Sequence, residues 1–278
     1  MNLKPNFLIV GAQKAGTTSL YYYLKEHPEI CMSRKKEVHF FSVEENFNKG
    51  NSWYEKQFKH CAEKKAVGEA SPLYLYLPYV PQRIYDYNPN MKLIFVLRNP
   101  VERAWSHYWH MRRMGRENRV FEQALQEEER RIQKNFSCGR RYSYKDRGKY
   151  IEQINRFLKY FPREQMFFII SKELKNEPEK VLKDLYHFLG IEEKQIKNNK
   201  KIQAMESRRS KIQLISKILY NSFLGNFTIL RKMNDKLNAK PVGEKMKPET
   251  REYLIDFFRD SNNKLAKKFG LHIQHWNQ

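Results

Sequence analysis

A short apolar run in this chain leads directly into a glycine- and threonine-rich turn and then into a helical pattern, over residues 6–20 (NFLIVGAQKAGTTSL). In a strand–loop–helix unit of this kind, backbone N–H groups of the turn and of the helix N-terminus converge on one point, where the helix dipole adds partial positive charge. An anionic phosphate is stabilised at such a point. The sequence therefore predicts a phosphate-binding loop after its first strand.

The lysine of this loop does not stand where nucleoside triphosphatases have it. Their Walker sequence, G-x-x-x-x-G-K-[ST], places the lysine directly after the second glycine. Gly11 and Gly16 keep that spacing here, but Thr17 occupies the lysine position and Lys14 precedes the second glycine. We therefore expect the loop to hold a nucleotide phosphate, while Lys14 reaches a bridging oxygen at which negative charge develops during transfer. A tight turn that binds no ligand is the alternative.

Apolar runs of strand length alternate with helical patterns along the chain. The runs that predict strands are residues 7–10, 65–68, 92–97 and 165–170. The helical patterns cover residues 17–27, 80–87, 100–114, 150–160, 178–189 and 248–269. This alternation predicts an α/β fold whose central parallel β-sheet is flanked by helices on both faces. Ligands of such sheets bind beyond the carboxyl ends of the strands.

Length and composition favour a single domain with a polyanionic partner. With 278 residues and no low-complexity linker, we expect one domain over residues 1–278. Residues 191–240 break the alternation, because they are basic and contain an apolar stretch at 212–229, and they predict a basic flap or a helical insertion. The net charge of +22 indicates a polyanionic partner, although a lysine-rich composition alone also produces it.

The cysteines and the N-terminal sequence predict a soluble, cytoplasmic protein. Cys31, Cys61 and Cys138 are odd in number and lack a C-x-x-C spacing, which argues against a disulfide framework or a zinc site and suits a reducing compartment. The apolar run at residues 7–10 is too short for the core of a signal peptide or for a membrane span.

Two other strand ends carry residues suited to group transfer. Arg98 follows the strand at residues 92–97, where its planar guanidinium can bind a phosphate bidentately, and Ser106 lies about two turns into the next helix. Glu69 follows the strand at residues 65–68 and is a candidate general base for an attacking hydroxyl. Each of these residues has an alternative interpretation without a role in catalysis or binding, since such residues are often solvent-exposed or paired in salt bridges.

The segment Lys36-Glu-Val-His39-Phe-Phe41 mixes charged and aromatic residues and predicts an edge strand or a packed loop. A lone histidine in such a segment is more often structural than catalytic. The remaining histidines show no metal-binding spacing of the H-E-x-x-H kind, so the sequence predicts no metal site.

Taken in order, these motifs resemble the sulfotransferase family that uses 3′-phosphoadenosine 5′-phosphosulfate (PAPS), and within it the heparan-sulfate-type branch with its bacterial homologues. The resemblance covers residues 11–20, 36–41, 53–54, 68–74, 81–89, 92–108 and 156–162. A loop with lysine before its second glycine, joined to a Leu-Arg-Asn-Pro…Ser block, is a specific pair. The resemblance implies the sulfotransferase fold and transfer of a sulfuryl group to a hydroxyl or amino group, with adenosine 3′,5′-bisphosphate (PAP) as product. Because a sulfuryl group carries less charge than a terminal phosphate, we expect a lysine and helix N–H groups to suffice without a metal.

The same resemblance implies roles for the loop and for the two strand ends. It assigns the 5′-phosphosulfate to Gln13, Lys14, Ala15, Gly16, Thr17, Thr18 and Ser19. Lys14 would be the catalytic cation at the leaving phosphate. Arg98 and Ser106 match the pair that binds the 3′-phosphate, and Glu69 falls at the position of the general base.

Three more residues receive roles from the resemblance. Lys36 and His39 would face the acceptor. Relatives close the cofactor site with a basic Lys-Gly-Arg segment late in the chain, and here Lys240 stands in the corresponding place, in a sequence that departs from that pattern. The acceptor is expected to be a glycan or an acidic polysaccharide, with no nucleic acid partner and no transmembrane segment.

Two other functions remain open. A P-loop kinase or ATPase would hold ATP on the same strand–loop–helix unit, but Thr17 at the lysine position and Arg98 in place of an acidic strand end disfavour it. A non-catalytic polyanion- or nucleic-acid-binding protein would explain the arginine pairs at 112–113, 130–131, 140–141 and 208–209. It would leave the placement of Lys14 unexplained.

Overall fold

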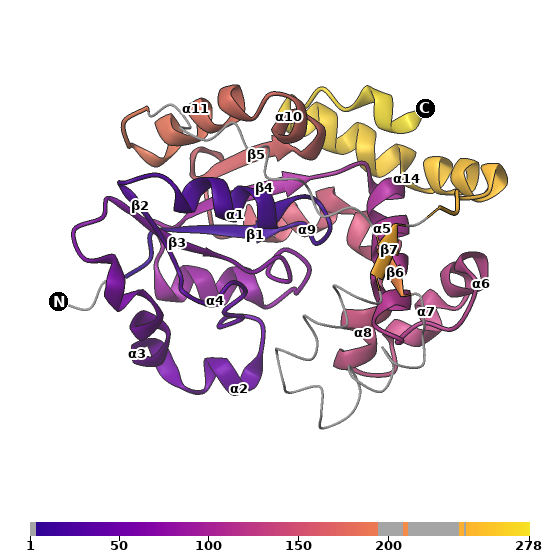
Figure 1. The fold of residues 1–278 in the computed structure, drawn as a ribbon, viewed down its shortest axis with the longest axis horizontal. Coiled ribbons are helices and arrows are strands. Elements are labelled where there is room, and N and C mark those ends of the chain that lie inside the picture. The colour runs from indigo at the N-terminus through magenta and orange to yellow at the C-terminus, as the bar shows by residue number, and fades with distance from the viewer. Residues whose placement is uncertain (1–3, 194–207, 211–238, 242) are drawn as a thin grey trace. The chain divides into compact units, whose positions relative to one another are not determined.

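The computed structural model describes residues 4–193, 208–210, 239–241 and 243–278, which fall into two compact units (Figure 1). Unit 1 comprises Met1–Arg98 and Ile151–Ala204, and unit 2 comprises Asn99–Tyr150 and Met205–Gln278. Most of the flap or insertion predicted at 191–240 lies outside the described residues.

Five parallel strands form the sheet of unit 1. They are β1 Phe7–Gly11, β2 Ile30–Met32, β3 Ala66–Ala70, β4 Lys92–Leu97 and β5 Met166–Ile170. Their order is β2-β3-β1-β4-β5, so β1 is central and pairs with both β3 and β4. All five residues of β1 and of β3 are buried, as expected for strands covered on both faces. The carboxyl ends of β3, β1 and β4 consequently lie side by side.

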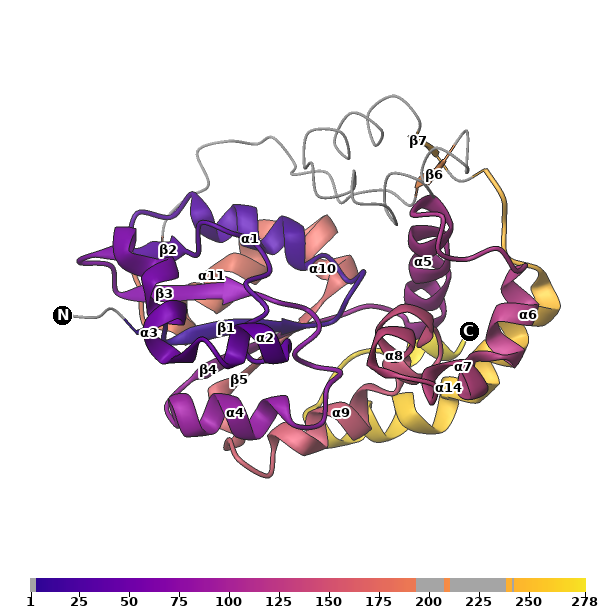
Figure 2. The ribbon, with the colours of Figure 1, turned by 90° about the horizontal axis from the view of Figure 1, so that it is seen from below.

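Helices cover both faces of this sheet. The helical elements of unit 1 are α1 Thr17–Lys25, α2 Glu44–Phe47, α3 Gly50–Glu55, η1 Lys56–Cys61, α4 Val80–Tyr87, α9 Tyr150–Phe157, η3 Arg163–Gln165, α10 Ser171–Asn176 and α11 Pro178–Leu189. Figure 2 shows α1, α10 and α11 on one side of the sheet and α4 and α9 on the other. In α4 the buried residues Val80, Ile84 and Tyr87 recur at helical spacing and form the face that packs inward. The predicted α/β class with a central parallel sheet is confirmed.

Unit 2 is mainly helical in its described part. Its elements are α5 Pro100–Arg113, α6 Phe121–Gln126, α7 Glu128–Ile132, α8 Phe136–Tyr142, η2 Asp146–Gly148, β6 Arg208–Ser210, β7 Ala239–Pro241, α14 Pro248–Phe269 and η5 Gln274–Asn277. Its core gathers apolar residues of α5, α6 and α14, among them Trp109, Phe121 and Phe258. The Asn99 side chain accepts a 2.9 Å hydrogen bond from the Val101 N–H and caps α5.

The predicted helices and strands are all present, with small differences at their ends. The prediction missed the short elements, among them β2, β6, β7, α2, α3, α6, α7, α8 and α10, because three to seven residues are too few to display a periodicity. Of the two structures predicted for residues 36–41, the loop is correct and the edge strand is wrong. Glu37 and His39 have φ values of 62° and 57°, which no strand accommodates, and the strand at that edge of the sheet is β2.

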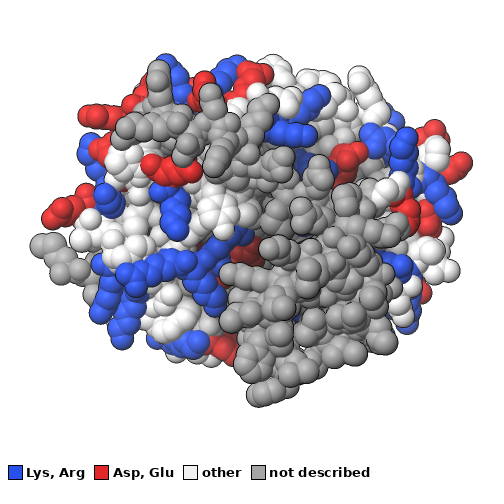
Figure 3. Space-filling model, viewed as in Figure 1, with Lys and Arg blue, Asp and Glu red and all other residues white. Residues whose placement is uncertain are grey.

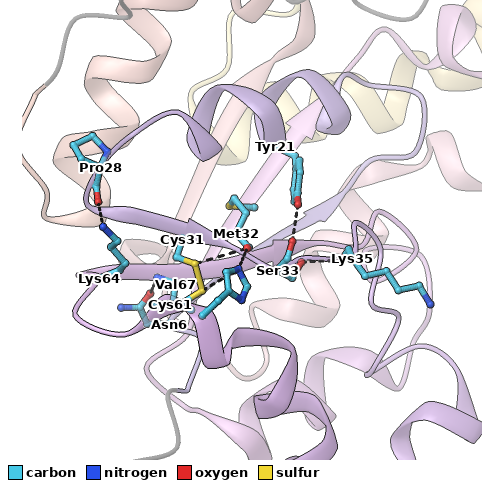
Figure 4. Close-up of a disulfide and its surroundings, with 11 residues drawn as sticks. Asn6, Tyr21, Pro28, Cys31, Met32, Ser33, Lys35, Cys61, Lys64 and Val67 are labelled. Carbon is cyan, nitrogen blue, oxygen red and sulfur yellow. Dashed lines mark hydrogen bonds between the residues drawn. A yellow bond between two sulfur atoms is a disulfide. The ribbon is translucent and has the colours of Figure 1, made fainter.

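The expectation that the cysteines form no disulfide is wrong. Cys31 in β2 and Cys61 at the end of η1 are disulfide-bonded, with their Cα atoms 5.4 Å apart (Figure 4). The two cysteines lie 30 positions apart in the sequence and meet only because η1 packs on β2, so their spacing carried no signal. Cys138 in α8 is unpaired, which accounts for the odd count.

Gly68 is the tightest point of the central sheet, and its replacement by alanine tests the packing. A Cβ atom there would overlap the carbonyl oxygen of Phe7 and lie 2.7 Å from the Phe7 ring. We expect Gly68→Ala to lower the free energy of unfolding by roughly 1–3 kcal/mol or more, measured by urea denaturation. Gly139→Ala in α8 is the matched control, because its Cβ would have no atom nearer than 3.5 Å. Equal stabilities of the two variants would contradict this packing.

Glu128 makes the stability of unit 2 depend on pH. Burial raises the pKa of Glu128 to about 7, although the backbone N–H groups of Lys145 and Asp146 hydrogen-bond to its carboxylate at 2.7 and 2.8 Å. Since the folded pKa exceeds the usual value of 4.5, the proton stabilises the fold fully below about pH 4.5, and this stabilisation is lost as the pH rises through 7.

We therefore expect the difference in unfolding free energy between the wild type and Glu128→Gln to change by up to about 3 kcal/mol between pH 4.5 and 7.5, with the wild type losing stability as the pH rises. Urea titrations at several pH values measure it. A difference that does not change over this range would mean that the pKa of Glu128 in the folded protein is not raised.

Candidate active site

The predicted phosphate loop connects β1 to α1 in unit 1. β1 ends at Gly11 and α1 begins at Thr17, so residues 12–16 form the loop. Gly16 has a φ of 104°, a left-handed conformation that favours glycine. A Cβ atom on Gly11 would lie 2.6 Å from Cβ of Leu75, so a side chain does not fit there. Each glycine of the motif is thus required by the geometry of the loop.

The start of α1 supplies the N–H groups that the sequence predicted. Gly16 occupies the N-cap position and has no side chain to cap the helix, so the first-turn N–H groups remain for another acceptor. Thr17 and Ser19 are largely buried, whereas Gln13, Lys14 and Thr18 are partly exposed. Lys14 also has a positive φ of 69°, a conformation that is rare for a residue with a side chain and is concentrated at functional sites.

Arg98 lies against the phosphate loop. It follows β4, which pairs with β1, and its Nη1 donates a hydrogen bond to the carbonyl oxygen of Lys14 at 3.3 Å. Nearby, the N–H of Ala12 donates to the carbonyl of Val96 at 2.6 Å, which fixes the loop to the end of β4. The structure thus brings together the loop and Arg98, two motifs that are more than 80 residues apart in the chain.

The other two residues predicted for the 3′-phosphate belong to unit 2. Ser106 lies in α5 and is 2% exposed. Lys240 lies in β7, where it pairs with Arg209 of β6, and its side chain is outside the described residues. Their roles at the nucleotide remain predictions.

Glu69, at the end of β3, is completely buried and accepts hydrogen bonds from four donors. Its Oε1 accepts from the hydroxyls of Tyr74 (2.6 Å) and Tyr54 (3.0 Å). Its Oε2 accepts from the Ser71 hydroxyl (2.6 Å) and the Val38 N–H (3.2 Å). Burial raises the pKa of this carboxyl, and the hydroxyl donors oppose that shift. Four donors use the lone pairs that a carboxylate offers, so this group holds its surroundings together.

The loop at 36–41 is attached to the end of β3 through these contacts. The N–H of Glu37 donates to the carbonyl of Ala70 at 3.1 Å, and the N–H of His39 donates to the Ser71 hydroxyl at 3.1 Å. The main chain of this loop is therefore fixed one strand away from the phosphate loop. Both predicted acceptor residues, Lys36 and His39, lie on it.

Glu37 is a carboxylate that the prediction of site residues missed, although it stands between the two predicted residues. Lys36 Nζ lies 2.7 Å from its Oε1, and His39 Nε2 lies 3.3 Å from its Oε2. Burial raises the pKa of Glu37, but the His39 hydrogen bond and the Lys36 ammonium outweigh this effect and lower it to about 2. Its side chain is 40% exposed, whereas Glu69 is sealed. The sequence signal was the acidic residue between the two predicted side chains.

The sequence model of the sulfotransferase domain matches residues 4–270, which is nearly the whole chain. This protein belongs to the sulfotransferase family. The predicted family is thereby confirmed, and it is a family of PAPS-dependent transferases.

Two relatives and one solved structure illustrate the similarity. Human heparan sulfate glucosamine 3-O-sulfotransferase 5 is 33% identical over 190 residues, which cover 67% of this chain and 54% of the relative. Membrane-associated sulfotransferase kil1 of Dictyostelium discoideum is 26% identical, with 94% and 64% covered. The crystal structure of a sulfotransferase from Alicyclobacillus acidocaldarius is 31% identical, with a TM-score of 0.76 over 99% of this chain and 100% of that one.

The chain spans between half and two thirds of the length of these two curated relatives. Within the described residues, the helices are too short or too polar to cross a membrane.

Proposed function

We propose that this protein transfers a sulfuryl group from PAPS to a hydroxyl or amino group of a carbohydrate acceptor. The observation that carries the proposal is the geometry of the loop between β1 and α1. Lys14 precedes Gly16, both have a positive φ, and Arg98 donates a hydrogen bond to the carbonyl oxygen of Lys14. This arrangement combines a cation, first-turn helix N–H groups and a guanidinium at one edge of the sheet, as an anionic nucleotide requires.

On the donor side, the loop residues from Gln13 to Ser19 bind the 5′-phosphosulfate, and Lys14 stabilises the phosphate oxygen that carries the negative charge when the sulfuryl group leaves. Arg98 binds the 3′-phosphate together with Ser106 and with Lys240. A sulfuryl group carries less charge than a terminal phosphoryl group, so a lysine and helix N–H groups suffice to stabilise the transfer, and the proposal includes no metal.

On the acceptor side, we assign the general base to Glu37 in place of the predicted Glu69. Each oxygen of the buried Glu69 already accepts two hydrogen bonds, so at least one donor would have to be displaced before it accepted a proton, whereas the side chain of Glu37 is 40% exposed and its lowered pKa keeps it ionised. An acceptor entering against Glu37 desolvates the carboxylate and raises its pKa toward the value a base requires. Lys36 and His39 then orient the acceptor, and Glu69 keeps their loop in place.

The acceptor is proposed to be an acidic glycan. The net charge of +22 favours collection of a polyanion, and the human relative is named for action on heparan sulfate. Figure 3 shows Lys and Arg side chains gathered over the N-terminal elements of unit 1, and Arg34 and Lys35, directly before Lys36, are exposed. The cytoplasmic location stays a proposal from the short apolar run at the N-terminus, because the Cys31–Cys61 disulfide removes the argument from the cysteines.

Lys14→Ala tests the donor side. Loss of one transition-state donor is expected to lower kcat by about a hundredfold or more, measured with radiolabelled PAPS and a panel of glycans. Lys25→Ala is the matched control, because Lys25 is an exposed lysine at the other end of α1. Calorimetry should detect PAP binding to the wild type in the absence of magnesium. Normal turnover by Lys14→Ala would refute the role of Lys14, and binding of Mg–ATP in preference to PAP would refute the proposed function.

Glu37→Gln and Glu69→Gln separate the two carboxylates. A base at Glu37 predicts that Glu37→Gln lowers kcat about 10²–10⁴-fold while PAP affinity and the thermal midpoint stay near wild type. Glu69→Gln should lower the thermal midpoint. The carboxylate offers two acceptor oxygens to its donors, whereas the amide would offer only one and leave some of the hydroxyls without an acceptor. The reverse result, a stable but inactive Glu69→Gln beside an active Glu37→Gln, would restore Glu69 as the base.

A further inference from the structure

Cys31, His60 and Cys61 form a cluster at the edge of the sheet that the proposed reaction does not use. The disulfide joins the edge strand β2 to η1, and Cys61 is fully buried while Cys31 is 9% exposed (Figure 4). His60 is exposed, and its Nε2 lies 3.2 Å from the carbonyl oxygen of Met32 and 3.7 Å from Sγ of Cys61. A carbonyl only accepts hydrogen bonds, so Nε2 carries the proton and presents an N–H to the sulfur.

The disulfide closes the part of the chain that carries the acceptor residues. Lys36, Glu37 and His39 lie between the two cysteines, and so does Tyr54, which donates to Glu69. Directly after β2, this segment is attached to α1, because the Tyr21 hydroxyl donates a 2.6 Å hydrogen bond to the carbonyl oxygen of Ser33. The donor loop at 12–16 lies outside it. Opening the disulfide therefore removes a covalent constraint from the acceptor segment, which then depends on its hydrogen bonds to the end of β3, and removes none from the donor loop.

The two sulfurs differ in a way that gives the exchange a direction. Of the two residues, Cys31 is 9% exposed and Cys61 is fully buried, and Cys61 has the His60 N–H beside it. When a thiolate RS⁻ attacks Sγ of Cys31, the Sγ–Sγ bond breaks and its electron pair leaves on Sγ of Cys61, where the N–H stabilises the thiolate. A second RS⁻ attacks the R sulfur of the mixed disulfide, releasing RSSR and the Cys31 thiolate, and solvent protonates both cysteines. In sum, the protein disulfide and two RSH give two protein thiols and RSSR.

We propose that Cys31, His60 and Cys61 are a thiol–disulfide exchange site for low-molecular-weight thiols and disulfides, and that its oxidation state controls the order of the acceptor segment. The link to the acceptor rests on the proposed function, whereas the exchange chemistry does not. The same three residues are also the one group of potential metal ligands found among the described residues, with ligand atoms within 4.8 Å of one another. While His60 Nε2 donates to Met32, the lone pair of the ring is on Nδ1.

The test uses the full chain carrying Cys138→Ser, which removes the remaining thiol from α8. Native protein is equilibrated in glutathione buffers, alkylated and analysed by mass spectrometry, and we expect Cys31 and Cys61 to gain and lose their label together. Reduction should lower the thermal midpoint by roughly 5–10 °C and speed proteolysis between residues 33 and 55. His60→Ala should slow reduction on the order of tenfold, because the leaving thiolate loses its donor.

Three results would overturn the proposal. Cysteines that react with glutathione only in denaturant would make the disulfide purely structural. A reduced protein that takes up one zinc ion and regains the oxidised thermal midpoint would make the cluster a metal site. Unchanged proteolysis on reduction would remove the control of the acceptor segment.

PAP calorimetry and acceptor kinetics keep this proposal separate from the proposed function. In the reduced protein, PAP affinity should equal that of the oxidised protein while the acceptor KM rises severalfold. If the disulfide exchanges with glutathione but the protein transfers no sulfuryl group, the proposed function is refuted and the exchange site is not.

Discussion

The parallel pairing of β1 with both β3 and β4 is the constraint on which the rest of unit 1 depends. It places three strand ends side by side, so that Gly11, Glu69 and Arg98, far apart in the sequence, belong to one edge of the sheet. The pairing in turn requires Gly68, because β1 approaches β3 too closely there for any side chain. The position of the strand ends therefore depends on a small residue within a strand. The helices on both faces exclude water from the strands themselves.

Burial of Glu69 is the second constraint, and its cost explains the residues around it. An unpaired carboxylate in this position would be strongly disfavoured, so the chain surrounds it with three hydroxyls and one backbone N–H. The donors come from three separate segments, and each is fixed in place by its bond to the carboxylate. The hydrogen bonds of one buried carboxyl group thus hold the main chain of the acceptor loop, which gives Glu69 a structural role that its place in the sequence did not reveal.

The donor half of the site was predictable because its signals are local. The glycine spacing, Lys14 and the helix start all lie within ten residues, and the conformations of Gly16 and Lys14 agree with the loop that they predicted. The acceptor half was less predictable because it depends on contacts between distant segments. Tyr54 meets Glu69 across 15 residues and Cys31 meets Cys61 across 30, and neither pairing has a periodicity or a spacing rule. The edge strand predicted at 36–41 was wrong for the same reason. The turns of this segment depend on hydrogen bonds to the end of β3, which is distant in the sequence.

The two halves are therefore stabilised by different means. The donor loop is held by backbone geometry, because the positive φ of Gly16 and hydrogen bonds to Val96 and from Arg98 fix its path. The acceptor loop has two positive-φ residues with side chains, Glu37 and His39, whose strain must be offset by their attachments to Glu69, Ser71 and Ala70. The Cys31–Cys61 disulfide closes the segment that contains this loop, and the donor loop at 12–16 lies outside that segment. Under the proposed function, opening this bond is therefore expected to affect recognition of the acceptor and to leave nucleotide binding intact.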